Sequence, residues 1–173
     1  YRFPDAESFM RALRKAHSRP YWAVWNADGA FDTGPLEKTA SLDCTITRRN
    51  TDHYWSSKYL VLPSSLEEGY YLVAVDIDGE KFYAPMQINS TSVYIMMAHD
   101  RCIAWLNDAV TGQPLSGAVF RHESGISGVT DSSGVATFDT PDATSDTGYE
   151  IFTAAHGSKL PFVALVSNLR PMY

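Results

Sequence analysis

The stretch that decides the fold is residues 104–138, AWLNDAVTGQPLSGAVFRHESGISGVTDSSGVATF. It opens with a strand-like run that ends at Asp108 and turns at Thr111-Gly112. A second such run covers residues 118–121, and a third covers residues 135–138 after a glycine-rich link. Short apolar runs of this kind, separated by turn residues, predict antiparallel β-structure.

The turn before the last run, Thr-Asp-Ser-Ser-Gly at residues 130–134, has side chains suited to a tight hairpin. Asp and Ser at the front of a turn hydrogen-bond their own backbone, and Gly134 adopts a positive φ at low cost. We therefore expect replacement of Gly134 by Val to destabilise the fold. A TDxxGxAxF hairpin is typical of small secreted β-sandwich domains.

The whole stretch resembles the W-x-x-D-x-x-T-G-x-P-x-x-G-A…T-D-x-x-G-x-A-x-F signature of macroglobulin-like domains in bacterial alpha-2-macroglobulins. Residues 1–13, YRFPDAESFMRAL, resemble the Y-R-x-x-x-x-E-x-F-x-R-A-L that follows a first strand in one such domain. Residues 66–73, LEEGYYLV, resemble its L-x-P-G-x-Y-L-V, with Glu68 in place of the usual proline. The resemblance covers nearly the whole chain, and it implies that Trp105 is a buried core residue.

Two parts of the chain resemble each other. GYYLVAVDIDGEKFYAPMQI, from Gly69, aligns with GYEIFTAAHGSKLPFVALV, from Gly148, with one residue deleted at the turn. Two similar hairpins about 80 residues apart predict two tandem modules of one architecture. We place the boundary near Asn89-Ser90, and expect an all-β protein of two tandem immunoglobulin-like antiparallel β-sandwiches, residues 1–89 and 90–173.

The first module is expected to carry the one helix. Residues 5–16 have apolar side chains at helical spacing, a capping Asp5 and basic residues near the end. Residues 39–47 alternate as a strand does, residues 58–62 form another strand, and residues 21–25 form an aromatic strand or arm. Residues 70–88 should form a hairpin.

The composition excludes several classes of partner. The chain has 173 residues, of which 45% are hydrophobic, and a formal net charge of −6. A net negative charge argues against binding to nucleic acid or to an anionic membrane surface. No apolar run approaches the roughly 20 residues of a membrane helix. The sequence begins at Tyr1 without Met or a signal-peptide pattern, so we expect it to be a piece of a longer protein.

The two cysteines, Cys44 and Cys102, both lie in alternating strand-like patterns. We expect both thiols to be free and shielded, as buried unpaired cysteines usually are. A disulfide between them would have to join the two predicted modules, which its short-range geometry disfavours.

The histidines do not predict a catalytic site. A hydrolase needs a nucleophile, a base and an orienting acid. No G-x-S-x-G motif and no histidine-flanked cysteine is present. The histidines fall at predicted helix ends, loops and strand ends, where we expect them to be solvated or loop-bonded: His17, His53, His99, His122 and His156.

Two short patterns suggest metals only faintly. Residues 76–80, Asp-Ile-Asp-Gly-Glu, lack the third acidic position and the twelfth-position Glu of a calcium loop, so a hairpin turn is the preferred interpretation. His122-Glu123 lacks the second histidine of a zinc helix, and we expect it at the surface. We therefore predict no metal ligand, cofactor or catalytic residue in this chain.

One group of aromatic residues could form a docking or sugar-stacking face, although filling the core or the seam between modules is the preferred interpretation. Its members are Tyr21, Trp22, Trp25, Tyr54 and Trp55.

The family resemblance implies a function. Members that trap proteases covalently carry a C-x-E-Q thioester, and neither cysteine here lies in that motif. The resemblance implies non-catalytic scaffold modules of a large extracytoplasmic, membrane-anchored protease inhibitor that closes on its target after cleavage of a bait. The partners would be neighbouring domains of the same chain and, through the whole protein, target proteases. The alternative is a cell-surface adhesion or ligand-binding array, and a hydrolase ranks third.

Overall fold

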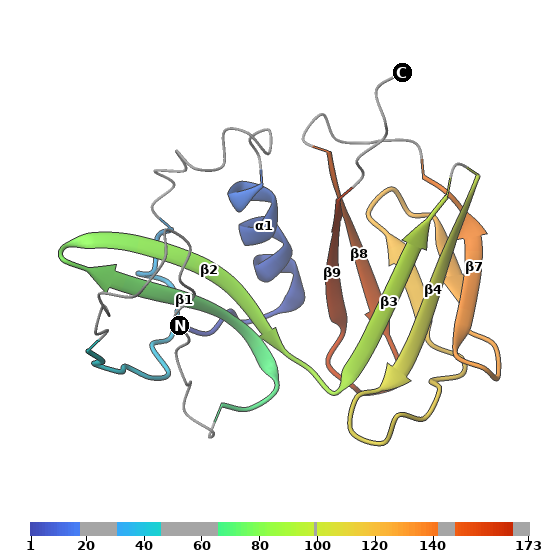
Figure 1. Cartoon of the computed structure of the whole chain (residues 1–173), viewed down its shortest axis with the longest axis horizontal. Coiled ribbons are helices and arrows are strands. Elements are labelled where there is room, and N and C mark those ends of the chain that lie inside the picture. Colours follow the sequence, from blue (N-terminus) through green and yellow to red (C-terminus); the bar gives the residue numbers. More distant parts are fainter. Residues whose placement is uncertain (18–30, 46–65, 99, 142–147, 168–173) are drawn as a thin grey trace, which may run out of the picture.

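The computed structural model describes residues 1–17, 31–45, 66–98, 100–141 and 148–167. This part of the chain is mostly β, with three antiparallel sheets and one short helix, which confirms the predicted all-β class (Figure 1). The elements are α1 (Ala6–Ala16), β1 (Gly69–Ile77), β2 (Glu80–Ile88), β3 (Thr91–Met97), β4 (Arg101–Asp108), β5 (Val119–His122), β6 (Ser127–Val129), β7 (Val135–Asp139), β8 (Tyr149–Ala155) and β9 (Phe162–Ser167).

Helix α1 forms where the sequence predicts it. Asp5 is the N-cap, and its side chain accepts a hydrogen bond of 2.7 Å from the Ser8 amide, which satisfies one of the free N–H groups of the first turn. Phe9 and Leu13 lie on one face and are buried. The helix therefore has a single apolar face, which must pack against a neighbour.

The hairpin of β1 and β2 also matches the prediction. Its two turn residues, Asp78 and Gly79, have φ of 54° and 89°. Two successive positive φ values give the turn whose twist fits a two-residue hairpin, and Asp-Gly is a favoured pair for it. The Asp76 carboxylate accepts a 3.0 Å hydrogen bond from the Gly79 amide, so this acidic pattern serves the turn.

The other two sheets face each other in the second half of the chain. Their strand orders are β3-β4-β7 and β6-β5-β8-β9. Both sheets contribute side chains to one buried cluster between them, including Leu106 from β4 and Phe120 from β5. Gly134 has the predicted positive φ, +77°, and a Cβ there would lie 2.5 Å from the Leu106 carbonyl oxygen.

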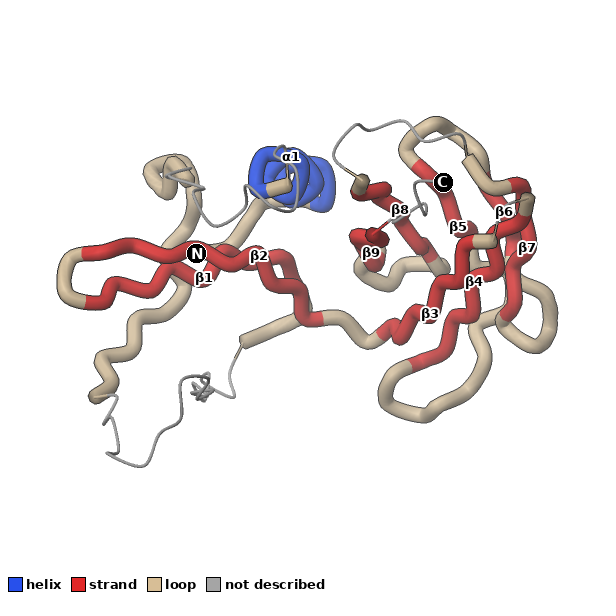
Figure 2. The backbone as a smooth tube through the Cα atoms, turned by 45° about the horizontal axis from the view of Figure 1, so that its top comes forward, coloured by secondary structure: helices blue, strands red, loops and turns tan. Residues whose placement is uncertain are grey.

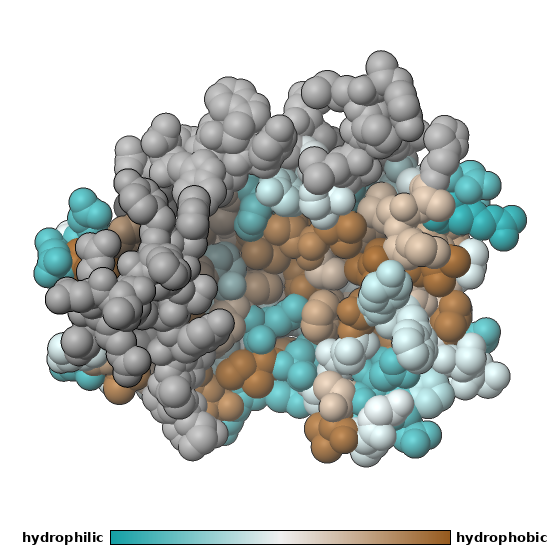
Figure 3. Space-filling model, viewed as in Figure 1, coloured by the Kyte–Doolittle hydropathy of each residue, from teal (hydrophilic) through white to brown (hydrophobic). Residues whose placement is uncertain are grey.

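A second buried cluster lies on the opposite face of β8 and β9. There, Ile151 and Val163 pack with Phe9 of α1 and with Tyr70 and Leu72 of β1. Figures 1 and 2 both place α1 between the hairpin and the β8–β9 edge of the second half. The space-filling view shows apolar residues gathered near the middle of the molecule, where the two halves meet (Figure 3). β8 and β9 therefore separate two cores.

The connection from β2 to β3 is the pair Asn89 and Ser90, at the predicted module boundary. None of the sheets in the described residues continues across it. The division of the chain into two domains stays a prediction.

The structure contradicts the expectations for residues 39–45, for Cys44 and for Trp105. Residues 39–45 form no strand, although their side chains alternate. Cys44 is exposed rather than shielded, whereas Cys102 is buried as expected. Trp105 is 49% exposed, because Cys102, Ala104 and Leu106 occupy the inward positions of β4 and successive residues of a strand point to opposite faces. Residues 21–25, 46–47 and 58–62 lie outside the described part of the chain.

Candidate functional site

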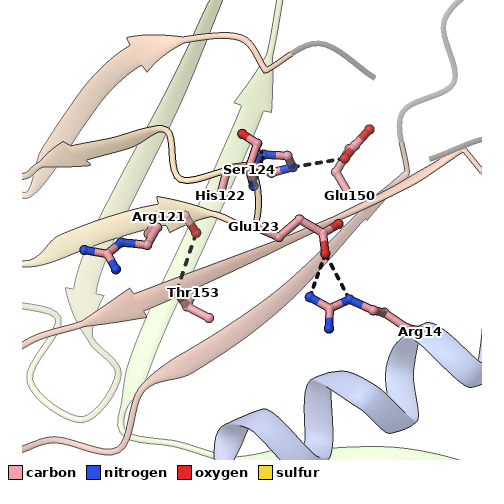
Figure 4. A network of polar contacts seen from close by, with 7 residues as sticks. All are labelled: Arg14, Arg121, His122, Glu123, Ser124, Glu150 and Thr153. Atoms are coloured by element: carbon pink, nitrogen blue, oxygen red, sulfur yellow. Dashed lines mark hydrogen bonds and ion pairs between the residues drawn. The ribbon is translucent and has the colours of Figure 1, made fainter. Parts of the chain in front are cut away.

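A network of charged and polar side chains lies where α1 approaches the ends of β5 and β8 (Figure 4). His122 is the last residue of β5, and Glu150 is the second residue of β8. Both side chains are completely buried, at 0% exposure. Burial of an ionisable pair is costly unless each member has a partner, so these contacts decide what the site can do.

Strand alternation explains why His122 is inside. On β5, Phe120 and His122 occupy the buried positions, while Val119 and Arg121 are exposed. The imidazole packs on the Phe152 ring, with centroids 4.7 Å apart. The expectation that His122 lies at the surface is therefore wrong, and the two-residue period that begins at Phe120 was the signal that could have shown it.

The hydrogen bonds define the tautomer of the His122 ring. The Ser124 amide donates to Nδ1 at 3.2 Å, and the Ser124 hydroxyl lies 2.8 Å from the same nitrogen. Since a backbone N–H can only donate, Nδ1 is the acceptor and the proton of the neutral ring is on Nε2. Nε2 then donates to Glu150 Oε2 at 3.0 Å.

The neighbouring residue, Glu123, links this site to the helix. One of its carboxylate oxygens accepts two hydrogen bonds from Arg14 of α1, at 2.9 Å from Nε and 2.7 Å from Nη2. The two side chains are 48% and 23% exposed, so solvent screens the pair, and we expect it to contribute about 1 kcal/mol or less. Its importance is positional, because it joins residues 109 apart in sequence.

The order hydroxyl, imidazole, carboxylate is also that of a hydrolase relay. Such a relay works only when N–H donors are free to stabilise an oxyanion beside the nucleophile. Here the Ser124 amide is bonded to Nδ1, and the Gly125 amide donates to the His122 carbonyl at 2.9 Å. The amides nearest the hydroxyl are thus engaged, and the geometry favours a structural role.

The same site offers three potential metal ligands. His122, Glu123 and Glu150 each have one ligand atom within 4.8 Å of the others. Imidazole and carboxylate are zinc ligands. The guanidinium of Arg14 already balances Glu123, and the imidazole N–H already bonds Glu150, so a cation would have to displace both. The three side chains are already hydrogen-bonded, so they fit a structural polar cluster better than a metal centre.

A second set of polar contacts joins the hairpin to the free edge of β9. The side chain of Gln87 donates through Nε2 to the Val163 carbonyl at 2.7 Å, and its Oε1 accepts from the Val163 main-chain N–H at 3.0 Å. The Tyr70 hydroxyl donates to the Pro161 carbonyl, and Asn89 donates to the Leu160 carbonyl at 3.0 Å. Burial raises the pKa of Tyr70 to about 12, so the hydroxyl keeps its proton at neutral pH.

The remaining predicted residues do not join this site. His17 Nδ1 lies 3.0 Å from the Leu13 carbonyl at the end of α1, and His156 Nε2 lies 3.2 Å from the Ser116 carbonyl. His53, His99 and the aromatic group at residues 21–25 and 54–55 lie outside the described residues. Sequence reasoning missed Glu150, Ser124 and Arg14 as partners, because contacts between distant strands leave no local signal.

Searches for related proteins gave no further information. No family model, curated protein or solved structure matches this chain. Among the described residues, no helix is long and apolar enough to cross a membrane.

Proposed function

We propose that this chain is a pair of non-catalytic, tandem immunoglobulin-like β-sandwich modules of macroglobulin type, residues 1–89 and 90–173. They would form a rigid part of the scaffold of a bacterial alpha-2-macroglobulin-like protease inhibitor. The family and the extracytoplasmic location come from the sequence resemblance alone. The mechanical role has a structural basis, which is the way the two halves are fastened together.

The observation that supports a rigid scaffold is the double attachment of the first half to the second. Apolar side chains of α1 and β1 pack on the outer face of β8 and β9. Polar contacts hold the two margins of this interface, Arg14 with Glu123 on one side and Gln87 with Val163 on the other. Linked domains with small polar interfaces usually move relative to each other, and an apolar contact with fastened margins resists such motion.

The His122–Glu150 pair fits this role. A buried, fully hydrogen-bonded polar pair fixes one packing arrangement rather than adding much stability. It lies beside the Glu123 contact with α1, above that contact in the view of Figure 4. We infer that the pair holds the end of β5 so that Glu123 faces Arg14.

The test is made on the intact inhibitor that contains this chain. A trap closes around a protease, so the bound enzyme should lose activity on a large protein substrate but keep it on a small chromogenic peptide. We expect that pattern for the intact protein, and weaker retention after Arg14→Ala together with Gln87→Ala. Lys38→Ala with Gln113→Ala is the matched control. Protease activity that is unchanged on both substrates would contradict the proposal.

Two assays on the chain alone examine the rival functions. Binding to immobilised glycans or host proteins would favour the adhesion array. Ester hydrolysis that disappears in Ser124→Ala, with an unchanged unfolding midpoint, would favour an enzyme.

A further inference from the structure

The outer face of the sheet β3-β4-β7 carries a patch of exposed apolar side chains. Cys102, Ala104 and Leu106 point into the core, so the residues between them on β4 point outward, and β3 and β7 alternate in the same way. Figure 3 looks onto this face and shows apolar residues there among hydrophilic ones. Five outward side chains that adjoin one another form what we call the outer patch: Tyr94, Met96, Ile103, Trp105 and Val135.

The outer patch is continuous across the three strands. Tyr94 is the register partner of Trp105, and Trp105 is that of Val135, so these side chains form one row. Met96 and Ile103 form the next row. The exposed fractions of Tyr94, Met96 and Trp105 are 62%, 46% and 49%. Because Trp, Tyr and Met are enriched where proteins meet, a contiguous patch of them indicates a docking surface.

The indole ring of Trp105 is held in place although it is half exposed. Its Nε1 donates a hydrogen bond to the Ser133 carbonyl at 3.2 Å. A side chain that is already fixed loses little conformational entropy when a partner covers it. The first half of the chain packs against β8 and β9, in the other sheet, and so leaves the outer patch open.

Two opposite charges lie side by side at one end of the outer patch. Arg101 of β4 is the register partner of Asp139 of β7, and both residues are exposed. In the described part of the chain, neither side chain forms an ion pair or a hydrogen bond. A positive and a negative charge placed next to each other make a surface that is complementary to a second copy of itself turned over.

We propose that the outer patch binds a second copy of this chain face to face, about a two-fold axis that runs along the strands between β4 and β7. This axis exchanges the places of β4 and β7, so Arg101 of each copy faces Asp139 of the other. Trp105 faces Val135 of the second copy for the same reason, since these residues are also register partners. The first half lies beside β3 (Figure 1), so the two first halves lie on opposite sides of the dimer. The proposal goes beyond the scaffold function, because it concerns a face that the attachment of the two halves does not use.

The size of the outer patch predicts a weak dimer. At about 4.8 Å between strands and about 3.4 Å per residue, three strands of about five residues cover roughly 250 Å² of each copy. A standard stable interface buries about 800 Å² per partner. We therefore expect the copies to associate only at high concentration, with a dissociation constant of about 0.1–1 mM.

Sedimentation equilibrium of the chain between about 10 μM and 1 mM measures this association. The mean mass should rise with concentration above the 19.2 kDa of the single chain. Trp105→Ala should weaken the association by about tenfold or more, as loss of a central aromatic side chain does at an interface. Phe82→Ala is the matched control, because Phe82 is an aromatic residue of similar exposure, 52%, on β2, and it should leave the association unchanged.

Charge variants distinguish a contact between copies from a contact within one chain. Arg101→Asp alone places like charges at each contact, and so does Asp139→Arg alone, so each variant should associate about tenfold or more weakly than the parent. An equimolar mixture of the two variants should recover the association, because the acidic patch end of one then faces the basic patch end of the other. A neighbour within one chain cannot produce that recovery. A constant mass of 19.2 kDa, an association that these three substitutions leave unchanged, or a mixture that fails to recover would overturn the proposal.

Discussion

The side chain of Gln87 acts as a strand partner for Val163: its amide both donates to and accepts from the main chain of that residue, 76 positions later. Val163 belongs to β9, the edge strand of its sheet. Unpaired edges of this kind invite non-specific association, and covering them is a common protective device. Here the cover comes from the other half of the chain, which links protection of the edge to the attachment of the hairpin.

Replacement of Gln87 by Leu should therefore destabilise the protein by about 1–3 kcal/mol, because it leaves a partly buried N–H and C=O of Val163 without partners. Urea unfolding is the measurement. Gln113→Leu, on an exposed loop, is the control and should stay within about 0.5 kcal/mol of the parent. Equal effects of the two substitutions would show that the Val163 contacts carry no net stability.

The buried pair should respond strongly to loss of one member. His122→Leu should cost about 3–5 kcal/mol, since it leaves the Glu150 carboxylate buried without its imidazole partner. The double variant His122→Leu with Glu150→Leu should be less destabilised than the sum of the two single changes, which a double-mutant cycle measures.

Ser124→Ala is the internal control for that cycle. The serine is exposed, and its main-chain N–H remains available to His122 Nδ1, so the free energy of unfolding should change by about 0.5 kcal/mol or less. Additive single effects at His122 and Glu150 would refute the coupling.

Replacement of Leu106 by Ala should destabilise the protein more than replacement of its larger neighbour Trp105 by Ala. Trp105 is about half exposed and its indole N–H bonds the Ser133 carbonyl at 3.2 Å, so Trp105→Ala should cost about 1 kcal/mol. Leu106 is fully buried, and Leu106→Ala should cost about 2–5 kcal/mol. Thermal unfolding of both variants is the measurement. A larger loss of stability for Trp105→Ala than for Leu106→Ala would show that the exposed face of Trp105 is covered.

Two glycines of similar φ provide a matched pair. Gly134 and Gly112 have φ of +77° and +70°, so alanine is strained at both, by about 1–2 kcal/mol. Only at Gly134 does the new Cβ also meet a main-chain oxygen, that of Leu106, at 2.5 Å, whereas nothing lies within 4 Å of it at Gly112. Gly134→Ala should therefore lower the unfolding midpoint clearly more than Gly112→Ala. Equal decreases of the unfolding midpoint would mean that the positive φ alone, without the contact to the Leu106 carbonyl, explains the glycine at position 134.

The sequence was informative where the signal is local. The cap at Asp5, the turn at Asp78-Gly79 and the positive φ of Gly134 all depend on residues close together in the chain, and each is confirmed. Residues 39–45 alternate like a strand but form none, because pairing depends on a neighbour that the pattern does not specify.

The errors at Trp105 and His122 have a different cause. In both cases the strand alternation was enough to predict the correct face. The family resemblance placed Trp105 in the core instead, and the usual surface location of histidine placed His122 outside. The partners of His122 and Glu123 could not be predicted, since Glu150 and Arg14 come from elements that meet only through tertiary packing.

Strand β8 places consecutive residues in different cores, with Ile151 facing α1 and the hairpin and Phe152 facing the three-stranded sheet. On β9, Val163 and Ala164 divide in the same way. A protease cut at Asn89 that released the first half would leave Ile151 and Val163 bare to water, together with an open strand edge. An apolar patch beside a free edge is an aggregation site. The first half therefore acts on the second as an intramolecular chaperone, because it covers an aggregation-prone apolar face and strand edge.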